Sequence, residues 1–168
     1  MIGIILLKDI GVLMQNTVSK EVMTKIYQAI EQDGIQKVVV GAVIDMGDKN
    51  PLLLKRTADD FMGELVELPS GTVDSGETLE EALVREVKEE TNLTITKITK
   101  FISTFDYLSG SGKKTRQVNF KVQILDKNIK LSSEHESYYT YAVDSTRYCQ
   151  LTISPETKKV ILKAFDMM

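Results

Sequence analysis

Three glutamates near the middle of the chain have the spacing that points most directly to chemistry. Glu86, Glu89 and Glu90 fall within about one turn of a predicted helix. At 100° per residue, Glu86 and Glu90 continue the stripe that the apolar Leu79 and Leu83 begin, whereas a solvated helix carries its acidic residues on the opposite face. We therefore expect these carboxylates to line a pocket at the edge of the core.

Carboxylates this close together repel each other. A like-charge pair one turn apart costs a few tenths of a kcal/mol on an exposed helix, and partial burial raises that cost. A bound divalent cation would relieve the repulsion, and carboxylate oxygens are ligands that Mg²⁺ and Mn²⁺ prefer. The spacing therefore predicts a metal site.

The segment around these glutamates resembles the Nudix box of the Nudix hydrolase family. That box reads G-x5-E-x7-R-E-U-x-E-E-x-G-U, where U is aliphatic. Here Gly71, Glu77 and the run Arg85 to Leu93 match every fixed letter except the last glycine, which is Asn92. The resemblance covers roughly residues 37–165, and it implies a Nudix-type α/β/α sandwich with a mixed β-sheet and a catalytic helix from Thr78 to Thr91.

The resemblance also implies what the matching residues do. Nudix enzymes hydrolyse a nucleoside diphosphate linked to another group, with Mg²⁺ or Mn²⁺ as cofactor. The implied metal ligands are Glu86, Glu89, Glu90 and the backbone carbonyl of Ser70, and Glu89 is also expected to act in catalysis. Arg85 and Glu77 match the pair that orients the loop and the helix beside the site, Arg85 being placed with the catalytic residues and Glu77 and Gly71 with the structural ones.

The family often takes its proton acceptor from a loop outside the box. The candidate loop here is residues 132–136, and we favour Glu134 over Glu136 because Glu134 followed by His135 resembles the family's loop pattern. A solvated loop charge is an equally good interpretation of Glu134. His135, the only histidine, is interpreted as an exposed loop residue.

Tyr107 and Arg116 flank a predicted β-turn and are candidates for substrate binding. The alternative is that they are ordinary solvated residues of a hairpin. Asn92 replaces the glycine that follows the box helix, so we expect it in the left-handed conformation just past Thr91. The lone Cys149 is interpreted as a small core residue.

The elements that must position these residues can be drawn from periodicity and turn signals. We expect a hairpin from 38–44 and 52–54, a strand over 64–68, a loop over 70–77, one or two strands over 93–108, a strand through Val118 to Ile124, a polar loop over 126–136, a strand through Tyr139 to Val143 and a last helix from Pro155. Thr78 and Glu81 form a capping box. These elements together indicate an α/β fold.

Residues 1–36 are expected to form an N-terminal extension to a Nudix domain over 37–168. Val18, Val22, Ile26 and Ile30 have helical spacing, and Gly34 is a plausible stop. Their apolar face should be buried, either on the sheet of the same chain or in a homodimer.

Composition excludes several function classes. The chain has 168 residues with 21 Lys and Arg against 24 Asp and Glu, a net charge of −3, which argues against a nucleic-acid partner. No apolar run approaches the ~20 residues of a membrane span. The single cysteine excludes an internal disulfide and fits a cytoplasmic protein.

The expected activity is hydrolysis of a nucleoside triphosphate, intact or oxidised, to a monophosphate and pyrophosphate. An ADP-ribose or nucleotide-sugar pyrophosphatase is the second expectation. A non-catalytic module that senses nucleotides is the alternative of a different class.

Overall fold

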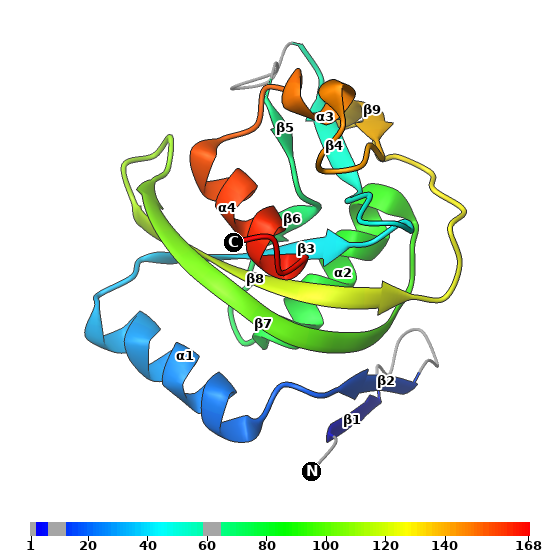
Figure 1. Cartoon of the computed structure of the whole chain (residues 1–168). Helices are drawn as coiled ribbons and strands as arrows, with labels where there is room; N and C mark the ends of the chain where they lie inside the picture. Colours follow the sequence, from blue (N-terminus) through cyan, green and yellow to red (C-terminus); the bar gives the residue numbers. More distant parts are fainter. Residues whose placement is uncertain (1–2, 7–12, 59–64) are drawn as a thin grey trace.

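The chain folds around one mixed β-sheet with helices on both of its faces (Figure 1). The computed structural model describes residues 3–6, 13–58 and 65–168. The strands are β1 (Gly3–Leu6), β2 (Leu13–Asn16), β3 (Lys37–Ile44), β4 (Leu53–Arg56), β5 (Val66–Glu67), β6 (Ser70–Thr72), β7 (Ile95–Leu108), β8 (Lys114–Ile124) and β9 (His135–Tyr139). The helices are α1 (Lys20–Gln32), α2 (Leu79–Thr91), α3 (Thr146–Cys149) and α4 (Pro155–Ala164).

The main sheet has six strands in the order β1-β2-β7-β8-β3-β6. The pairs β2–β7 and β3–β8 are parallel, and the other neighbours are antiparallel. A smaller antiparallel sheet has the order β5-β4-β9. The expected α/β sandwich with a mixed sheet is thus confirmed, and β6 is left at one edge of the main sheet.

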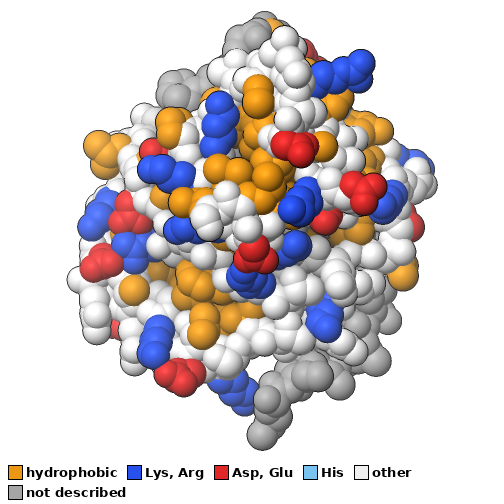
Figure 2. Space-filling view, in the orientation of Figure 1, with side chains coloured by type: hydrophobic (Ala, Val, Ile, Leu, Met, Phe, Trp, Pro, Cys, Tyr) orange, Lys and Arg blue, Asp and Glu red, His pale blue; other side chains and the backbone are white. Residues whose placement is uncertain are grey.

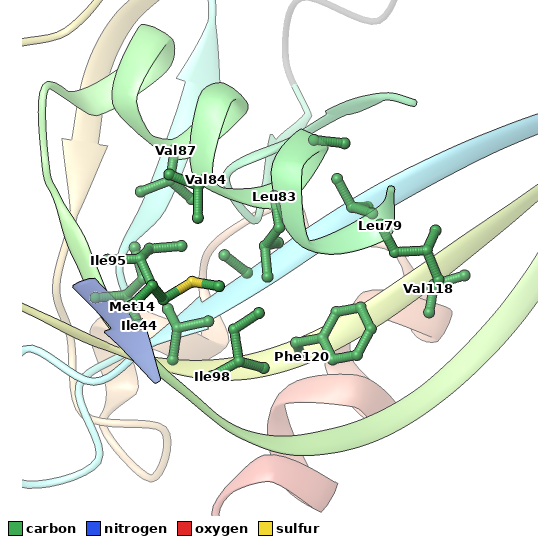
Figure 3. Close-up of a cluster of buried hydrophobic side chains, with 14 of the residues drawn as sticks. Met14, Ile44, Leu79, Leu83, Val84, Val87, Ile95, Ile98, Val118 and Phe120 are labelled. Atoms are coloured by element: carbon green, nitrogen blue, oxygen red, sulfur yellow. The ribbon is translucent and has the colours of Figure 1, made fainter. Parts of the chain in front are cut away.

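Two hydrophobic cores lie on opposite faces of the main sheet. Alternate residues of β3 serve each of them, since Val40 and Ile44 join one core and Val43 joins the other. The first core lies beneath α2, whose apolar side chains point at β3, β7 and β8 (Figure 3). The second lies between the sheet, α4 and the smaller sheet.

The predicted hairpin is only half right. The turn forms, because Leu52 N donates to Ile44 O at 2.9 Å, but β3 and β4 then diverge into different sheets. Both edges of β3 are already occupied, by β8 and by β6, so β4 has no place beside it. This divergence carries β4 over to the smaller sheet.

The N-terminal helix forms where it was expected, and it packs on its own chain. Ser19 caps α1 by accepting from Val22 N, and Gly34 follows the helix at a φ of +62°. Met23 and Ile26 are buried in the first core. The sequence pattern did not predict β2, which adds to β7 in parallel.

α1 does not cover the sheet completely. Figure 2 shows hydrophobic side chains in a hollow where α1 faces β7. This cavity of about 360 Å³ is lined mainly by Val22, Ile26, Ala29 and Phe101. It is remote in sequence from the acidic stripe of α2.

After α2, the observed elements differ from the predicted ones in several details. β7 is one strand of 14 residues with irregular pairing, and β9 begins at His135, earlier than the tyrosine pattern indicated. Cys149 is exposed rather than part of the core; the neighbouring Tyr148 is buried instead. Among the described residues, no helix has both the length and the apolarity that a membrane span needs.

Candidate active site

The acidic stripe lies on α2, a helix with well-defined ends. The expected capping box is present: Glu81 N donates to Thr78 Oγ1 at 3.2 Å, and Thr78 N donates to Glu81 Oε2 at 2.9 Å. Leu79 and Leu83 anchor one side of the helix in the first core. Fixed in this way, the helix presents its last two turns to β6 and to the smaller sheet.

Of the three carboxylates, the two that continue the apolar stripe are the more buried, in line with their expected place at the edge of the core. Glu90 is buried, Glu86 is partly buried, and Glu89 is exposed. Glu89 stands off the stripe, so its side chain is 60% accessible. The three carboxylates therefore occupy a gradient from core to solvent rather than one common environment.

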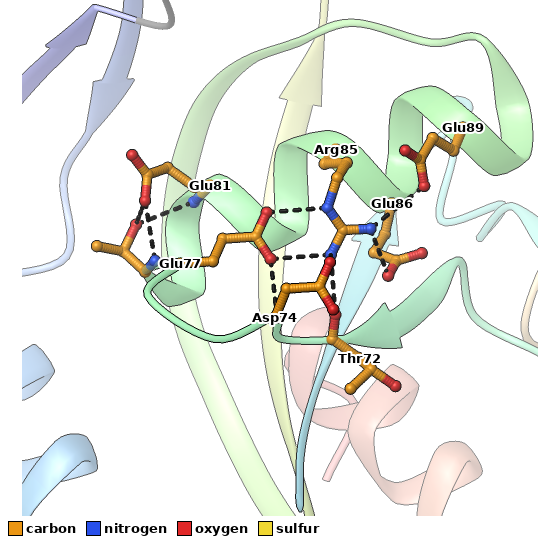
Figure 4. A network of polar contacts seen from close by, with 8 residues as sticks. Thr72, Asp74, Glu77, Glu81, Arg85, Glu86 and Glu89 are labelled. Carbon is orange, nitrogen blue, oxygen red and sulfur yellow. Dashed lines mark hydrogen bonds and ion pairs between the residues drawn. The ribbon is translucent and has the colours of Figure 1, made fainter.

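Arg85 ties the loop after β6 to the helix (Figure 4). Its Nε and Nη2 donate to the two oxygens of Glu77, both at 2.9 Å, and Nη2 also donates to the Thr72 carbonyl. Its Nη1 donates to Glu86 at 2.8 Å and to Glu89 at 3.2 Å. This fork holds the pKa of Glu77 below its usual range. The geometry supports an orienting role for Arg85 and Glu77.

Gly71 lets the Glu86 carboxylate come against the backbone of β6. A β-carbon built on Gly71 would lie 1.9 Å from the carboxyl carbon of Glu86 and 2.1 Å from each of its oxygens. Such contacts are far inside van der Waals distance. Only glycine therefore allows this placement of Glu86.

Glu90 fills the buried end of the site. Ser70 N donates to its Oε2 at 2.8 Å, so the contact seen at Ser70 uses the amide, whereas the resemblance implied its carbonyl. Burial, reinforced by the charges of Glu67 and Glu86, raises the pKa of Glu90 to about 8. Burial likewise raises the pKa of Glu86. Both carboxyl groups lie where added positive charge would be stabilising.

The smaller sheet adds residues that the sequence did not mark as part of the site. His135 is fully buried rather than exposed, and its Nε2 lies 3.8 Å from an oxygen of Glu67 and 3.8 Å from one of Glu90. Arg56 Nε donates to Glu67 at 2.5 Å. Glu67 stands just before the box, but nothing local in the sequence indicates that β9 brings His135 to it.

The loop carboxylates lie apart from these contacts. Glu134 is exposed, and its backbone carbonyl accepts from Thr57 N at 3.2 Å. Glu136 forms an ion pair with Lys55 at 2.7 Å. Within the described part of the chain, no hydrogen bond or ion pair joins either side chain to the glutamates of α2, so the role of Glu134 stays a prediction.

Tyr107 and Arg116 lie on opposite faces of the main sheet. Asp106 is paired with Arg116 across β7 and β8, so the adjacent Tyr107 points the other way. Arg116 binds Asp106 at 2.7 Å and Asp33 at 2.8 Å beside α1. Phe105 packs against the second core, and its ring lies 6.0 Å from that of Tyr107, so the Tyr107 ring lies on the side of the smaller sheet. Burial raises the pKa of Tyr107.

The donor set suits a hard divalent cation. Among the residues that the structure describes, no three acidic, histidine or cysteine side chains already converge as a metal cage, and Arg85 holds Glu86 and Glu89. The chemistry still fits, because α2 carries the three carboxylates of the site, and the negative charges near Glu90 that raise its pKa would be offset by a cation. Glu86, Glu89 and Glu90 are the residues that would hold the ion.

Comparisons with known proteins agree with this geometry. The model of the NUDIX domain family matches residues 35–164. The chain is 50% identical over 56 residues to an ADP-ribose pyrophosphatase of Methanocaldococcus jannaschii, and 34% identical over 61 residues to an 8-oxo-dGTP diphosphatase of Escherichia coli. These matches cover 33% and 36% of this chain but only 32% and 47% of those relatives.

Solved structures share the fold over most of the chain. The MutT protein of Methanosarcina mazei superimposes with a TM-score of 0.64 at 26% identity, covering 77% of this chain and 92% of that one. An Ap4A hydrolase of Caenorhabditis elegans gives a TM-score of 0.61 at 24% identity, covering 77% of this chain and 96% of that one. The matched region includes α2 and the loop that precedes it.

Proposed function

The chain belongs to the NUDIX domain family, and we propose that it hydrolyses a pyrophosphate bond in a nucleoside diphosphate-linked substrate with a divalent cation. One observation carries this proposal: Glu86 and Glu90 continue the buried stripe of α2 to the edge strand β6, where Gly71 leaves room for Glu86 and the amide of Ser70 donates to Glu90. A helix with only a structural role gains nothing from burying carboxylates.

We assign a separate role to each group of residues in the site. Glu86, Glu89 and Glu90 would hold Mg²⁺ or Mn²⁺, which when bound neutralises diphosphate oxygens and lowers the pKa of water. Arg85 and Glu77 hold the loop after β6 in a fixed position against α2. A carboxylate must then accept the proton of the attacking water, and we assign this step to Glu134.

The assignment of Glu134 can be tested against its neighbour. Loss of a group that acts only in the transition state lowers kcat far more than it changes KM. Glu134→Gln should therefore lower kcat at least about tenfold, whereas Glu136→Gln should only weaken the ion pair with Lys55. Steady-state kinetics that show damage in Glu136→Gln and none in Glu134→Gln would move the role to Glu136.

Tyr107 is the residue that we propose for substrate binding. Its ring is 40% exposed and lies 6.0 Å, centroid to centroid, from that of Phe105, so the pair offers an aromatic surface on the side of Glu67. A nucleobase can stack on such a surface. Arg116 is held by two carboxylates beside α1, on the opposite face of the sheet, and so does not contribute to this surface.

We favour a nucleoside triphosphate, intact or oxidised, as the substrate. The similarity to an 8-oxo-dGTP diphosphatase supports it. The similarity to an ADP-ribose pyrophosphatase favours a second candidate, ADP-ribose or a nucleotide sugar. Both reactions need the same carboxylates, so the site itself does not separate them.

A substrate panel separates the candidates by their products. A triphosphate cleaved at its inner bond releases pyrophosphate, which inorganic pyrophosphatase converts to phosphate. ADP-ribose releases two phosphomonoesters, which alkaline phosphatase detects. Each arm is run with Mg²⁺ and with excess chelator, beside Glu90→Gln, and the products in chelator are separated by chromatography because both coupling enzymes need metal ions. Nucleotide binding without turnover in any arm would identify a sensing module, and turnover in chelator would contradict the metal assignment.

A further inference from the structure

His135 is buried at the candidate active site without a hydrogen bond to either ring nitrogen. Its side chain has no accessible surface, and within the described residues both Nδ1 and Nε2 lack a partner. A buried polar group without a partner is destabilising, whereas an apolar side chain would fill the same space without that cost. The position therefore calls for an explanation beyond packing.

The imidazole stands between two carboxylates that come from different elements. Nε2 lies 3.8 Å from Glu67 Oε1 on β5 and 3.8 Å from Glu90 Oε1 on α2. This separation is too long for a hydrogen bond. Hydrogen bonds of catalytic groups are often long before substrate binds and tighten in the complex.

Of the two carboxylates, Glu90 is the one that needs His135. Glu67 Oε1 already accepts from Arg56 Nε at 2.5 Å. Among the described residues, Glu90 is held only at Oε2, by Ser70 N at 2.8 Å, while its Oε1 lies nearest the imidazole. A carboxylate gripped by one oxygen can still rotate, and a second donor from β9 would stop that rotation.

We propose that His135 is a positioning residue for Glu90. Nε2–H donates to Glu90 Oε1 when the site is engaged, so that β6 and β9 together fix the carboxylate through Ser70 and His135. The proposal rests on the proposed function, because it takes Glu90 as a ligand of the cation. Partners of this kind, one step behind a metal ligand, affect metal affinity about 10–100-fold when they are removed.

Three substitutions test the donor and its reach. His135→Gln keeps an N–H donor near the position of Nε2. The side chain of His135→Asn also carries an N–H donor but is too short to bring it there. His135→Leu fills the space without any donor. The matched control is Tyr138→Leu, an exposed position on the same strand. Mn²⁺ binding to the full chain without substrate is measured by calorimetry, beside kcat, KM and the melting temperature.

The expected result is a split between the variants. His135→Gln and Tyr138→Leu should bind Mn²⁺ within about threefold of the unaltered chain, whereas His135→Leu and His135→Asn should bind it at least about tenfold more weakly. The same two should lose kcat more than they change KM. A folded His135→Leu protein with unaltered Mn²⁺ affinity and kcat would overturn the proposal.

Two further outcomes keep the test decisive. If His135→Leu does not fold, the comparison of Gln with Asn still decides, and equal Mn²⁺ affinity in these two variants would overturn the proposal. If the unaltered chain binds Mn²⁺ but hydrolyses nothing in the substrate panel, the proposed function fails, while the Mn²⁺ affinities still decide the role of His135.

Discussion

A carboxyl group as deeply buried as that of Glu90 makes the stability of the protein depend on its protonation. Glu90 accepts a hydrogen bond from the amide of Ser70, and the neighbouring charges of Glu67 and Glu86 oppose its ionisation. Keeping the proton is therefore the cheaper state of the folded protein without a cation. Glu90, one of the proposed metal ligands, is thus also a group whose ionisation is unfavourable in the folded protein.

This raised pKa fixes the sign of a pH dependence. The folded protein holds the Glu90 proton up to a pH of about 8, while the unfolded chain releases it near the ordinary value of 4.5. The folded state thus binds the extra proton between these values, and its stability falls as pH rises through that window. In chelator, the free energy of unfolding should fall by about 4 kcal/mol between pH 5 and pH 8.5 through this group.

Glu90→Gln should remove much of that dependence. The neutral amide cannot ionise, so the variant should gain stability over the unaltered chain at pH 8.5 and gain little at pH 5. Urea denaturation at both pH values measures the difference, with the exposed Glu89→Gln as the control. If Glu90→Gln and Glu89→Gln changed the free energy of unfolding by the same amount at both pH values, Glu90 would not hold its proton in the folded protein.

Gly71→Ala should damage the site more than the fold. The new β-carbon would collide with the Glu86 carboxylate, and that flexible side chain can swing away, so we expect a loss of less than about 2 kcal/mol in unfolding free energy. The displaced carboxylate should lower Mn²⁺ affinity and kcat at least about tenfold. Thr72→Ala, next along β6, is the control. A fully active Gly71→Ala protein would show that Glu86 need not approach the backbone.

At the scale of elements, the helix that carries the carboxylates is closed at both ends by local chemistry. Asn92 follows α2 at φ +62°, and its N–H donates to Lys88 O at 2.9 Å. This confirms the left-handed cap expected where the Nudix box has glycine. The carboxylates lie upstream of this cap, so the exchange leaves them in place.

Substitutions at Asn92 should follow the cost of that backbone conformation. Asn92→Gly should keep full activity and change stability by less than about 1 kcal/mol. Asn92→Val should be clearly less stable, because a β-branched residue strains at positive φ. Melting curves and rates for the two variants check this. A valine variant as stable as the unaltered chain would mean that the helix end can relax to another conformation.

Local signals in the sequence were enough to predict the ends of those helices that are capped by residues close in the sequence. The capping box at Thr78, the cap at Asn92 and the start at Ser154–Pro155 were all predicted, because each depends on neighbours within four residues. The strand over 64–68 was found as Val66–Glu67, with Glu64 outside the described residues.

Non-local pairing is where the sequence was insufficient. The divergence of β3 from β4 depends on β8 arriving from about eighty residues away. The burial of His135 depends on β9 pairing with β4. No periodicity within either segment carries that information, so the box carboxylates were predicted and the contribution of the smaller sheet was missed.

At the scale of the whole molecule, the N-terminal segment is part of the packed structure. Met14, Met23 and Ile26 are buried in the same core as α2, and β2 extends the main sheet through β7. A chain that begins at Gln36 would expose this surface to solvent. The catalytic helix and the N-terminal helix thus depend on one shared core.

Removing residues 1–35 should therefore be costly. We expect a loss of several kcal/mol, since burying one large apolar side chain contributes about 1.5–3 kcal/mol, together with self-association through the bared sheet face. Differential scanning calorimetry and analytical ultracentrifugation of the two chains measure both effects. A shortened chain that stays monomeric and equally heat-stable would show that the segment contributes no packing.

The edge position of β6 also determines when the site can assemble as the chain folds. Ser70 and Gly71 pair only with β3, and β3 must wait for β8, because their parallel pairing joins distant segments and such contacts form slowly. The β7–β8 hairpin can form early from local contacts. A helix of 13 residues gains most of its stability from packing, so the glutamates of α2 would be held against Ser70 only once the core and this edge have formed, and the pocket would be among the last parts to acquire its native form.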